Sequence, residues 1–147
     1  MEQTFVIIKP LGLQNFLVEI MGALRKVGTI VRRELKPVTR GLIEAHYAEH
    51  SGKSFFHRLP EYYEGETVLA LVLEGPDVIA RVRAIVGPSD PRKSEAGQVR
   101  HLVLTKWRDG KDGWSKIELA TSGVDNLVHA SDSPEAAERE IALWFPA

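Results

Sequence analysis

The alternation of apolar and polar residues predicts four strands in this chain. Residues 67–74 form the most apolar run and residues 4–9 form a second one, so both are predicted to be strands, the second of them central. Residues 29–38 alternate less cleanly, and residues 126–128 form a short fourth run. Helices are predicted where apolar residues recur every three or four positions, as at Phe16, Ile20, Leu24 and Val27 and again at Val78, Val82 and Ile85.

Cap and turn residues mark where these elements begin and end. Gly28 is predicted to end the first helix. Thr39 is the predicted N-cap of a helix that runs to about His50, and Ser133, followed by Pro134, is the predicted N-cap of the last helix. Without the helical segment between the second and third strands, the order is βαββαβ. This order is typical of the ferredoxin-like α+β plan, with a four-stranded antiparallel sheet covered by helices.

One stretch falls outside that plan. Residues 102–107 and 114–119 are β-like runs, and the aspartate and glycine residues between them are typical of turns. We therefore predict an inserted β-hairpin at about residues 101–121 that flanks a ligand cleft or a subunit contact. Trp107 and Trp114 would anchor it, because tryptophan buries a large apolar area. A disordered loop is the alternative, since long insertions cost little free energy.

The bulk composition limits the classes of protein that fit. The 147 residues suit one domain, residues 1–147, and 44% hydrophobic with 27% charged residues is typical of globular proteins. A net charge of −1 gives no basic field, so no nucleic-acid partner is expected. The chain has no cysteine for disulfides or thiolate metal sites. No apolar run reaches the roughly 18 residues of a membrane span, and no signal peptide is evident, so a cytoplasmic enzyme or binding module is expected.

His129 is the first candidate for chemistry. It lies in a loop of small and polar residues just before the predicted helix start at Ser133, where free backbone N–H groups favour anions. A neutral imidazole can act as a nucleophile. Glu140 shares a helix stripe with Ala136 and Trp144, so its carboxylate can hold one ring nitrogen of His129 and leave the other free. The alternatives are a histidine that only bridges strand and helix and an exposed glutamate.

Phosphate would need cations and hydrogen-bond donors, because the chain has no glycine loop of the Walker type. Lys9 ends a strand, Arg83 lies on a predicted helix, and Arg100 follows a loop rich in proline, serine and charge. Candidate donors are Tyr47, Ser89 and Asn126. Taken singly, Arg83 could be a surface residue and Tyr47 could pack against the neighbouring histidines.

Five ordered motifs together resemble the nucleoside diphosphate kinase family. The sequence HASDS at residues 129–133, followed by residues 137–145, resembles the family signature. Residues 4–10 resemble its first strand, residues 46–50 and 54–56 its nucleotide-cleft helices, and residues 87–91 and 97–100 its phosphate-side loop. The resemblance covers nearly the whole chain except a stretch after Arg100.

The resemblance implies a function and a role for each matching residue. It implies a kinase that moves the γ-phosphate of ATP to nucleoside diphosphates in a ping-pong cycle, through a phosphohistidine on His129. Glu140 would orient the histidine with help from Ser131, and Mg²⁺ would be carried by the nucleotide phosphates. The phosphates would lie among residues that offer positive charge or hydrogen bonds: Lys9, Tyr47, Arg83, Ser89, Arg100 and Asn126.

The resemblance also implies a slot for the nucleotide base. Phe55 would stack on the base and Leu59, one helical turn later, would form the opposite wall. Stacking does not read base edges, so broad nucleotide specificity follows. Core packing beside Phe56 is the alternative for Phe55.

Several positions depart from the usual family pattern. Leu11 stands where an aspartate is usual, Asp125 where an arginine is usual, and Ala130 where a glycine is usual. His101 and Leu102 replace a glycine–aspartate pair, and the 28 residues between Arg100 and His129 exceed the family norm. No phosphate ligand is lost, but the changes at Leu11 and Asp125 affect local packing or subunit contacts.

Two further function classes and an assembly state remain to be weighed. A non-catalytic nucleotide-binding or regulatory relative is opposed by the retained site residues, and a nucleic-acid-binding ferredoxin-like domain by the charge. The resemblance implies a homo-oligomer, a hexamer or a tetramer. An exposed-looking second strand and the apolar chain end at residues 144–147 also favour a partner surface.

Overall fold

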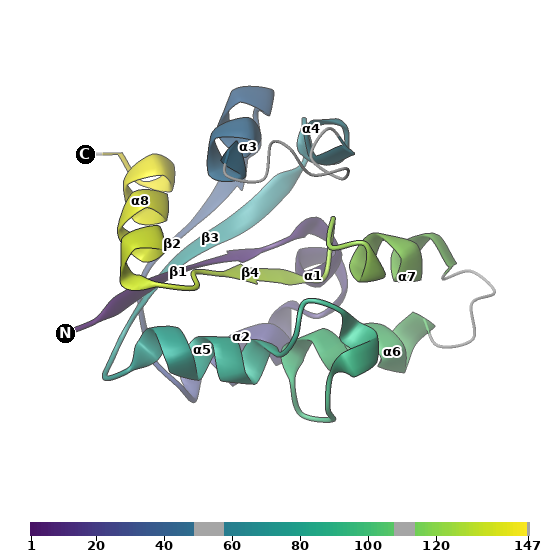
Figure 1. Ribbon diagram of the computed structural model, residues 1–147, viewed down its shortest axis with the longest axis horizontal. Coiled ribbons are helices and arrows are strands. Elements are labelled where there is room, and N and C mark those ends of the chain that lie inside the picture. The colour runs from purple at the N-terminus through teal and green to yellow at the C-terminus, as the bar shows by residue number, and fades with distance from the viewer. Residues whose placement is uncertain (49–57, 108–113, 147) are drawn as a thin grey trace.

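A four-stranded antiparallel sheet forms the centre of the molecule in a computed structural model that describes residues 1–48, 58–107 and 114–146. The strand order is β2-β3-β1-β4 (Figure 1). The strands are β1 Gln3–Ile8, β2 Thr29–Pro37, β3 Thr67–Glu74 and β4 Val128–Ala130. Every neighbouring pair is antiparallel, so the predicted ferredoxin-like α+β fold is confirmed.

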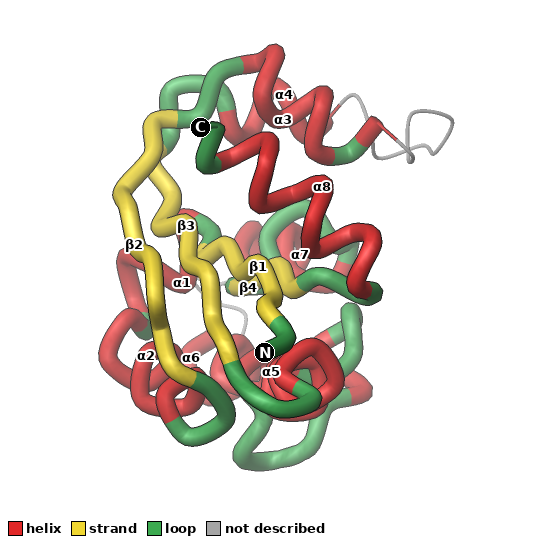
Figure 2. The backbone as a smooth tube through the Cα atoms, turned by 90° about the vertical axis from the view of Figure 1, so that its left-hand side faces the viewer, coloured by secondary structure: helices red, strands yellow, loops and turns green. Residues whose placement is uncertain are grey.

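Helices cover both faces of the sheet. One face carries α2, α5 and α6, and the other carries α3, α4 and α8 (Figures 1 and 2). The helices are α1 Pro10–Asn15, α2 Leu17–Arg25, α3 Arg40–His46, α4 Arg58–Tyr63, α5 Val78–Val86, α6 Leu102–Trp107, α7 Trp114–Thr121 and α8 Pro134–Trp144, with short 3-10 turns η2 Pro91–Lys93 and η3 Val99–His101. None of the helices in the described ranges is long and apolar enough to cross a membrane.

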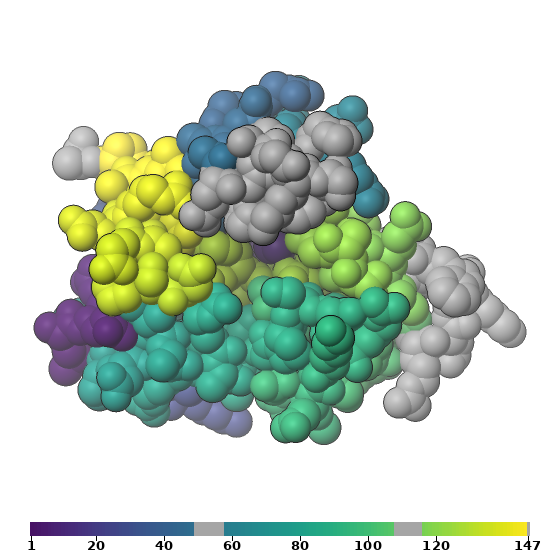
Figure 3. All heavy atoms as spheres, viewed as in Figure 1, coloured from purple at the N-terminus to yellow at the C-terminus, as the bar shows by residue number. Residues whose placement is uncertain are grey.

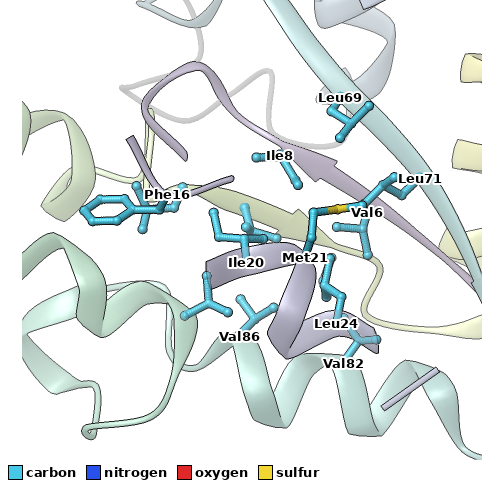
Figure 4. Packing of buried hydrophobic residues seen from close by; sticks show 14 of the residues in the cluster. Val6, Ile8, Phe16, Ile20, Met21, Leu24, Leu69, Leu71, Val82 and Val86 are labelled. Carbon is cyan, nitrogen blue, oxygen red and sulfur yellow. The ribbon is translucent and has the colours of Figure 1, made fainter. Parts of the chain in front are cut away.

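The central strands are apolar on both sides and build two separate cores. Successive side chains of a strand point to opposite faces. Val6 and Ile8 therefore join one core, where Ile20, Met21 and Leu24 of α2 face them (Figure 4). Phe5 and Ile7 join the other core, beneath α3, α4 and α8. This double burial explains why β1 and β3 are apolar runs without alternation.

The two predicted N-caps are confirmed. The Ser133 hydroxyl accepts a hydrogen bond from the Ala136 N–H at 3.1 Å, and Pro134 follows as the first helical residue. The Thr39 hydroxyl accepts one from the Leu42 N–H at 3.1 Å. These bonds satisfy backbone donors that the first helical turn leaves free.

The last strand begins two residues later than predicted. Leu127 has a φ of 78°, which an extended strand cannot contain, so β4 starts at Val128 and includes His129. The placement of His129 in a loop was therefore wrong. The Leu127 carbonyl accepts the Lys9 N–H at 2.9 Å. A Cβ atom at Gly12 would lie 2.7 Å from the same carbonyl oxygen, so only glycine fits there.

The predicted β-hairpin at residues 101–121 is wrong, because the described parts of this stretch are helical. Its first half is η3 and α6 and its second half is α7. Val103 and Trp107 are the buried residues of α6, and their spacing of four positions is that of one helix face. Trp107 packs edge-on against Phe16 with ring centroids 5.7 Å apart. The side chain of Trp114 and residues 108–113 lie outside the described part.

The apolar chain end needs no partner subunit to cover it. Trp144 is 1% exposed and Phe145 is 6% exposed within the single chain. The guanidinium of Arg32 lies 4.3 Å from the centre of the Phe145 ring. Trp144 and Phe145 therefore give no reason to expect an oligomer. The edge strand β2 does expose Val31 and Leu35, with 42% and 60% of their surfaces accessible.

Replacement of Trp107 tests whether the inserted helices belong to the core. Trp107→Ala should lower the free energy of unfolding by about 3–5 kcal/mol, because a large buried ring is lost. Thr105→Ala, at an exposed position of the same helix, should change it by less than about 0.5 kcal/mol. Urea denaturation followed by circular dichroism measures both. Equal midpoints for the two variants would mean that α6 contributes nothing to the core.

Candidate active site

A pocket of about 410 Å³ brings together most of the residues that the sequence singled out. It opens on the face shown in Figure 3, in a hollow between α8 and the end of α7. The predicted residues among its lining are Lys9, Tyr47, Arg83, Ser89, Arg100, Asn126, His129 and Glu140. Four of them lie in α5, η3, β4 and α8, and the other four lie in loops and turns, so the fold, and not sequence proximity, assembles the site.

His129 lies at the centre of β4, opposite Ile7 of β1. Its Nε2 atom is 2.8 Å from Oε1 of Glu140, and the Ser131 hydroxyl donates to the same oxygen at 2.7 Å. An ionised carboxylate only accepts hydrogen bonds, so Nε2 of His129 carries the proton. In a neutral ring the lone pair is then on Nδ1, which is the nitrogen free to react.

The surroundings keep the His129 ring neutral. Burial lowers the pKa of His129 well below its ordinary value, and the positive charges of Lys9, Arg100 and Arg83 lower it further. Burial raises the pKa of Glu140, and the hydrogen bond from Ser131 opposes that shift. The contact between His129 and Glu140 is therefore a hydrogen bond that a neutral imidazole donates to the carboxylate, and not an ion pair.

Lys9 extends into the pocket from the end of β1. It is 4% exposed, and its Nζ donates to Oδ1 of Asn126 at 2.9 Å. The Asn126 amide in turn donates to the Ser89 carbonyl at 2.8 Å, which ties this corner to the loop after α5. Burial is the main cause that lowers the Lys9 pKa to about 7, and Asp125 opposes it. Burial therefore weakens the hold of Lys9 on its proton, and a neighbouring negative charge strengthens it.

Two arginines add positive charge beside the histidine. Nη1 and Nη2 of Arg100 donate to the carbonyls of Gly87 and Val128 at 2.8 and 2.7 Å. Arg83 is an exposed residue of α5, but its Nη1 donates to the Ala130 carbonyl at 3.2 Å. Burial lowers the Arg100 pKa to about 10, so the group stays charged at neutral pH. These bonds fix both guanidinium groups before any ligand arrives.

His46 lines the pocket, although no role in the site was predicted for it from the sequence. Its ring centroid is 4.4 Å from that of His129. Its Nδ1 accepts the Trp144 N–H at 3.0 Å, so a neutral His46 carries its proton on Nε2. Burial and the neighbouring His129 lower its pKa. Its position beside Tyr47, which was a candidate, is the signal that could have identified it.

The predicted base slot is only partly described. Phe55 lies outside the described residues. Leu59 of α4 is 1% exposed and packs in the core beneath α3, α4 and α8, away from the described pocket lining. Thr121, Ser122 and Gly123 do line the pocket, so the end of the inserted segment borders the cleft as expected.

The pocket does not offer the ligand set that Mg²⁺ prefers. In the described ranges, the one group of three metal-ligating side chains is His46, His129 and Glu140, with ligand atoms within 4.8 Å of one another. Two of the three ligands are nitrogen atoms, whereas Mg²⁺ is held by oxygen. Glu140 also already accepts bonds from His129 and Ser131.

Comparisons with known proteins find relatives over nearly the whole chain. A nucleoside diphosphate kinase from Mycobacterium sp. (strain MCS) is 45% identical over 148 residues, which cover 99% of this chain and 97% of that protein. The crystal structure of a nucleoside diphosphate kinase from Encephalitozoon cuniculi superposes with a TM-score of 0.79 at 29% identity, over 100% of this chain and 90% of that one. A nucleoside diphosphate kinase family protein from Babesia bovis gives 0.79 at 33% identity, over 99% and 89%.

The family model described as nucleoside diphosphate kinase matches residues 2–147. This match spans the sheet, both helical layers and every described wall of the pocket. The chain belongs to the nucleoside diphosphate kinase family.

Proposed function

We propose that this protein is a nucleoside diphosphate kinase that works through a phosphohistidine on His129. The observation that carries the proposal is the hydrogen bond of 2.8 Å between His129 Nε2 and Glu140. That bond leaves Nδ1 as the basic nitrogen, in a pocket also lined by Lys9, Arg83 and Arg100. A neutral nucleophile next to fixed positive charges is what an incoming phosphoryl group requires.

The reaction would proceed in two matching half-reactions. The Nδ1 lone pair of His129 forms a bond to the γ-phosphorus of ATP as the bond from that phosphorus to the β-phosphate oxygen breaks. Nucleoside diphosphate leaves, and the ring gains positive charge that Glu140 stabilises through Nε2. A terminal phosphate oxygen of another nucleoside diphosphate then attacks the phosphorus, and the P–N bond breaks.

The pocket residues would hold the nucleotide phosphates during both steps. Lys9, Arg83 and Arg100 supply charge, and Tyr47, Ser89 and Asn126 supply hydrogen bonds. Because their partners already fix the arginines and Lys9, little reorganisation is needed as charge moves in the transition state. Phe55 would hold the base without reading its edges.

A divalent metal would accompany the nucleotide, and we propose Mg²⁺. The nitrogen-rich cluster around His129 is a poor match for that ion, which favours Mg²⁺ on the phosphates. There it would neutralise the charge that builds up on the phosphate oxygens.

Residues 1–147 would act as a single domain in the cytoplasm. The chain has no cysteine, so its stability does not depend on disulfides that reducing conditions would break.

The alternative of a non-catalytic relative is not favoured. Such a protein would have no need for an oriented, neutral histidine, yet His129, Glu140 and Ser131 form one hydrogen-bonded set. A nucleic-acid partner is also disfavoured by the net charge of −1.

The phosphoenzyme gives the most direct test. Incubation with γ-labelled ATP should leave acid-labile, base-stable label on the protein, and His129→Ala should abolish both label and turnover because the nucleophile is gone. Glu140→Ala should also slow turnover, but its rate should stay about 10²-fold above that of His129→Ala, because an orienting group contributes less than the nucleophile. Turnover of His129→Ala above about 1% of the unmodified rate would mean that another residue carries the phosphoryl group.

The arginines should act mainly on the transition state. Arg83→Ala and Arg100→Ala should each reduce kcat by about 10²-fold, the effect of removing one donor to developing charge. Steady-state kinetics measures kcat and KM separately. Arg92→Ala, outside the pocket on η2, is the control and should leave kcat unchanged. A raised KM with an unchanged kcat would show that the two arginines only anchor the nucleotide.

We also propose that the chain assembles into a hexamer or tetramer. The edge strand β2, with Val31 and Leu35 exposed, supports this assignment, since an unpaired edge favours association. Light scattering at micromolar concentration should give a mass four or six times that of the 16.4 kDa chain. A clean monomer mass would reject it.

A further inference from the structure

Asp125 is a buried carboxylate that the proposed reaction does not use. It is 0% exposed. Oδ2 accepts the Leu11 N–H at 2.9 Å and the Tyr62 hydroxyl at 2.5 Å, and Oδ1 accepts the Leu127 N–H at 3.1 Å. These donors come from the start of α1, from α4 and from the segment before β4. One side chain therefore joins three segments at the back of the pocket.

The partners of Asp125 indicate that it is ionised. Two are backbone N–H groups, which can only donate, and an ionised carboxylate can accept all three bonds. Burial raises the pKa of Asp125, and the charge of Lys9 is the strongest influence against that rise. A carboxylate accepting several hydrogen bonds is stabilised in its charged form. We take Asp125 as negatively charged at neutral pH.

The same segments fix the position of Lys9. The Leu127 carbonyl accepts the Lys9 backbone N–H at 2.9 Å, and the residue between Asp125 and Leu127 is Asn126, which accepts from Lys9 Nζ at 2.9 Å. Asp125 holds Leu127 in its left-handed conformation through the N–H bond. A change at Asp125 therefore reaches both the backbone and the side chain of Lys9.

We propose that Asp125 is a positioning residue that holds Lys9, through Leu127 and Asn126, where it can receive the nucleotide phosphates, and that supplies the negative charge which favours the charged form of Lys9. This inference rests on the proposed function. The usual family pattern has an aspartate at the position of Leu11 and an arginine at that of Asp125. In this chain the Asp125 carboxylate accepts the backbone N–H of residue 11. One carboxylate is therefore kept between these two positions.

The other groups around Lys9 cannot take over this role. Arg100 repels its positive charge, and Asn126 and Tyr47 are neutral. His129 and His46 are kept neutral by burial, and the charge of Lys9 itself lowers the pKa of each. Glu140, across the pocket on α8, is occupied by His129 and Ser131. Of the other carboxylates in the pocket lining, Asp90 is paired with Arg92, and Asp132 acts on His129. Asp125 is the anion that raises the Lys9 pKa against burial.

The pH profile of kcat/KM separates an electrostatic role from a structural one. Lys9 loses its proton as pH rises through its pKa, and removal of a nearby negative charge lowers that pKa. Asp125→Asn should therefore move the alkaline limb down by about one pH unit. Its kcat/KM should match the unmodified enzyme near pH 5.5 and fall about tenfold below it at pH 8. Tyr62→Phe, which removes one hydrogen bond to Asp125 and no charge, should leave the limb in place.

Two measurements keep the proposal falsifiable. If Asp125→Asn lowered kcat/KM by the same factor at every pH, or if the alkaline limb moved equally in Tyr62→Phe, the role of Asp125 would be purely structural. NMR titration of the Asp125 carboxyl carbon in the unmodified protein needs no variant, and a protonated carboxyl at pH 7 would overturn the proposal. NMR titration of the Lys9 side-chain nitrogen, in the unmodified protein and in Asp125→Asn, tests the effect of Asp125 on Lys9 without any enzyme turnover. The kinase mechanism is tested separately, by whether a phosphoenzyme forms.

Discussion

The pairing of β1 with β4 is the constraint on which the site depends. Ile7 lies opposite His129, and the strand that contains Ile7 is buried on both faces. A slip of one residue would turn every side chain of β4 to the other face. His129 would then point into the core under α2 and α5, away from Glu140 and His46. Burial of β1 in two cores excludes that slip, so packing far from the pocket fixes which way the nucleophile points.

The protein also holds the positively charged side chains of the pocket in position before a ligand binds. Lys9, Arg83 and Arg100 line the pocket, and their own hydrogen bonds hold them there. Their combined charge, with burial, keeps His129 unprotonated. The features that attract the phosphate are thus the same features that keep the nucleophile reactive.

The sequence predicted correctly those elements whose position depends only on residues within the element itself. The apolar runs of β1 and β3 and the caps Ser133 and Thr39 needed no tertiary information. The inserted segment was misjudged because Leu102 and Leu104 alternate like a strand, while the residues that the fold buries are Val103 and Trp107. The start of β4 was not predicted, because it is set by the positive φ angle of Leu127, a conformation for which leucine has no preference.

The site residues divided in the same way. Those within recognisable motifs, such as Lys9, Arg100 and His129, were found from the sequence. His46 and Asp125 were not assigned a role, because their importance comes from what the fold brings next to them: the His129 ring for one and the Leu11 backbone for the other.

The close approach of α1 to the segment before β4 also determines which substitutions residues 11 and 12 can accept. Leu11 contributes its backbone N–H to Asp125, and a backbone group is present whatever the side chain. Gly12 has no such freedom, because its missing Cβ makes room for the Leu127 carbonyl and for the Ile20 side chain. The bond to Asp125 therefore does not depend on the side chain of residue 11, which is constrained only by its packing in the core. Position 12, in contrast, is closed to every side chain larger than the hydrogen of glycine.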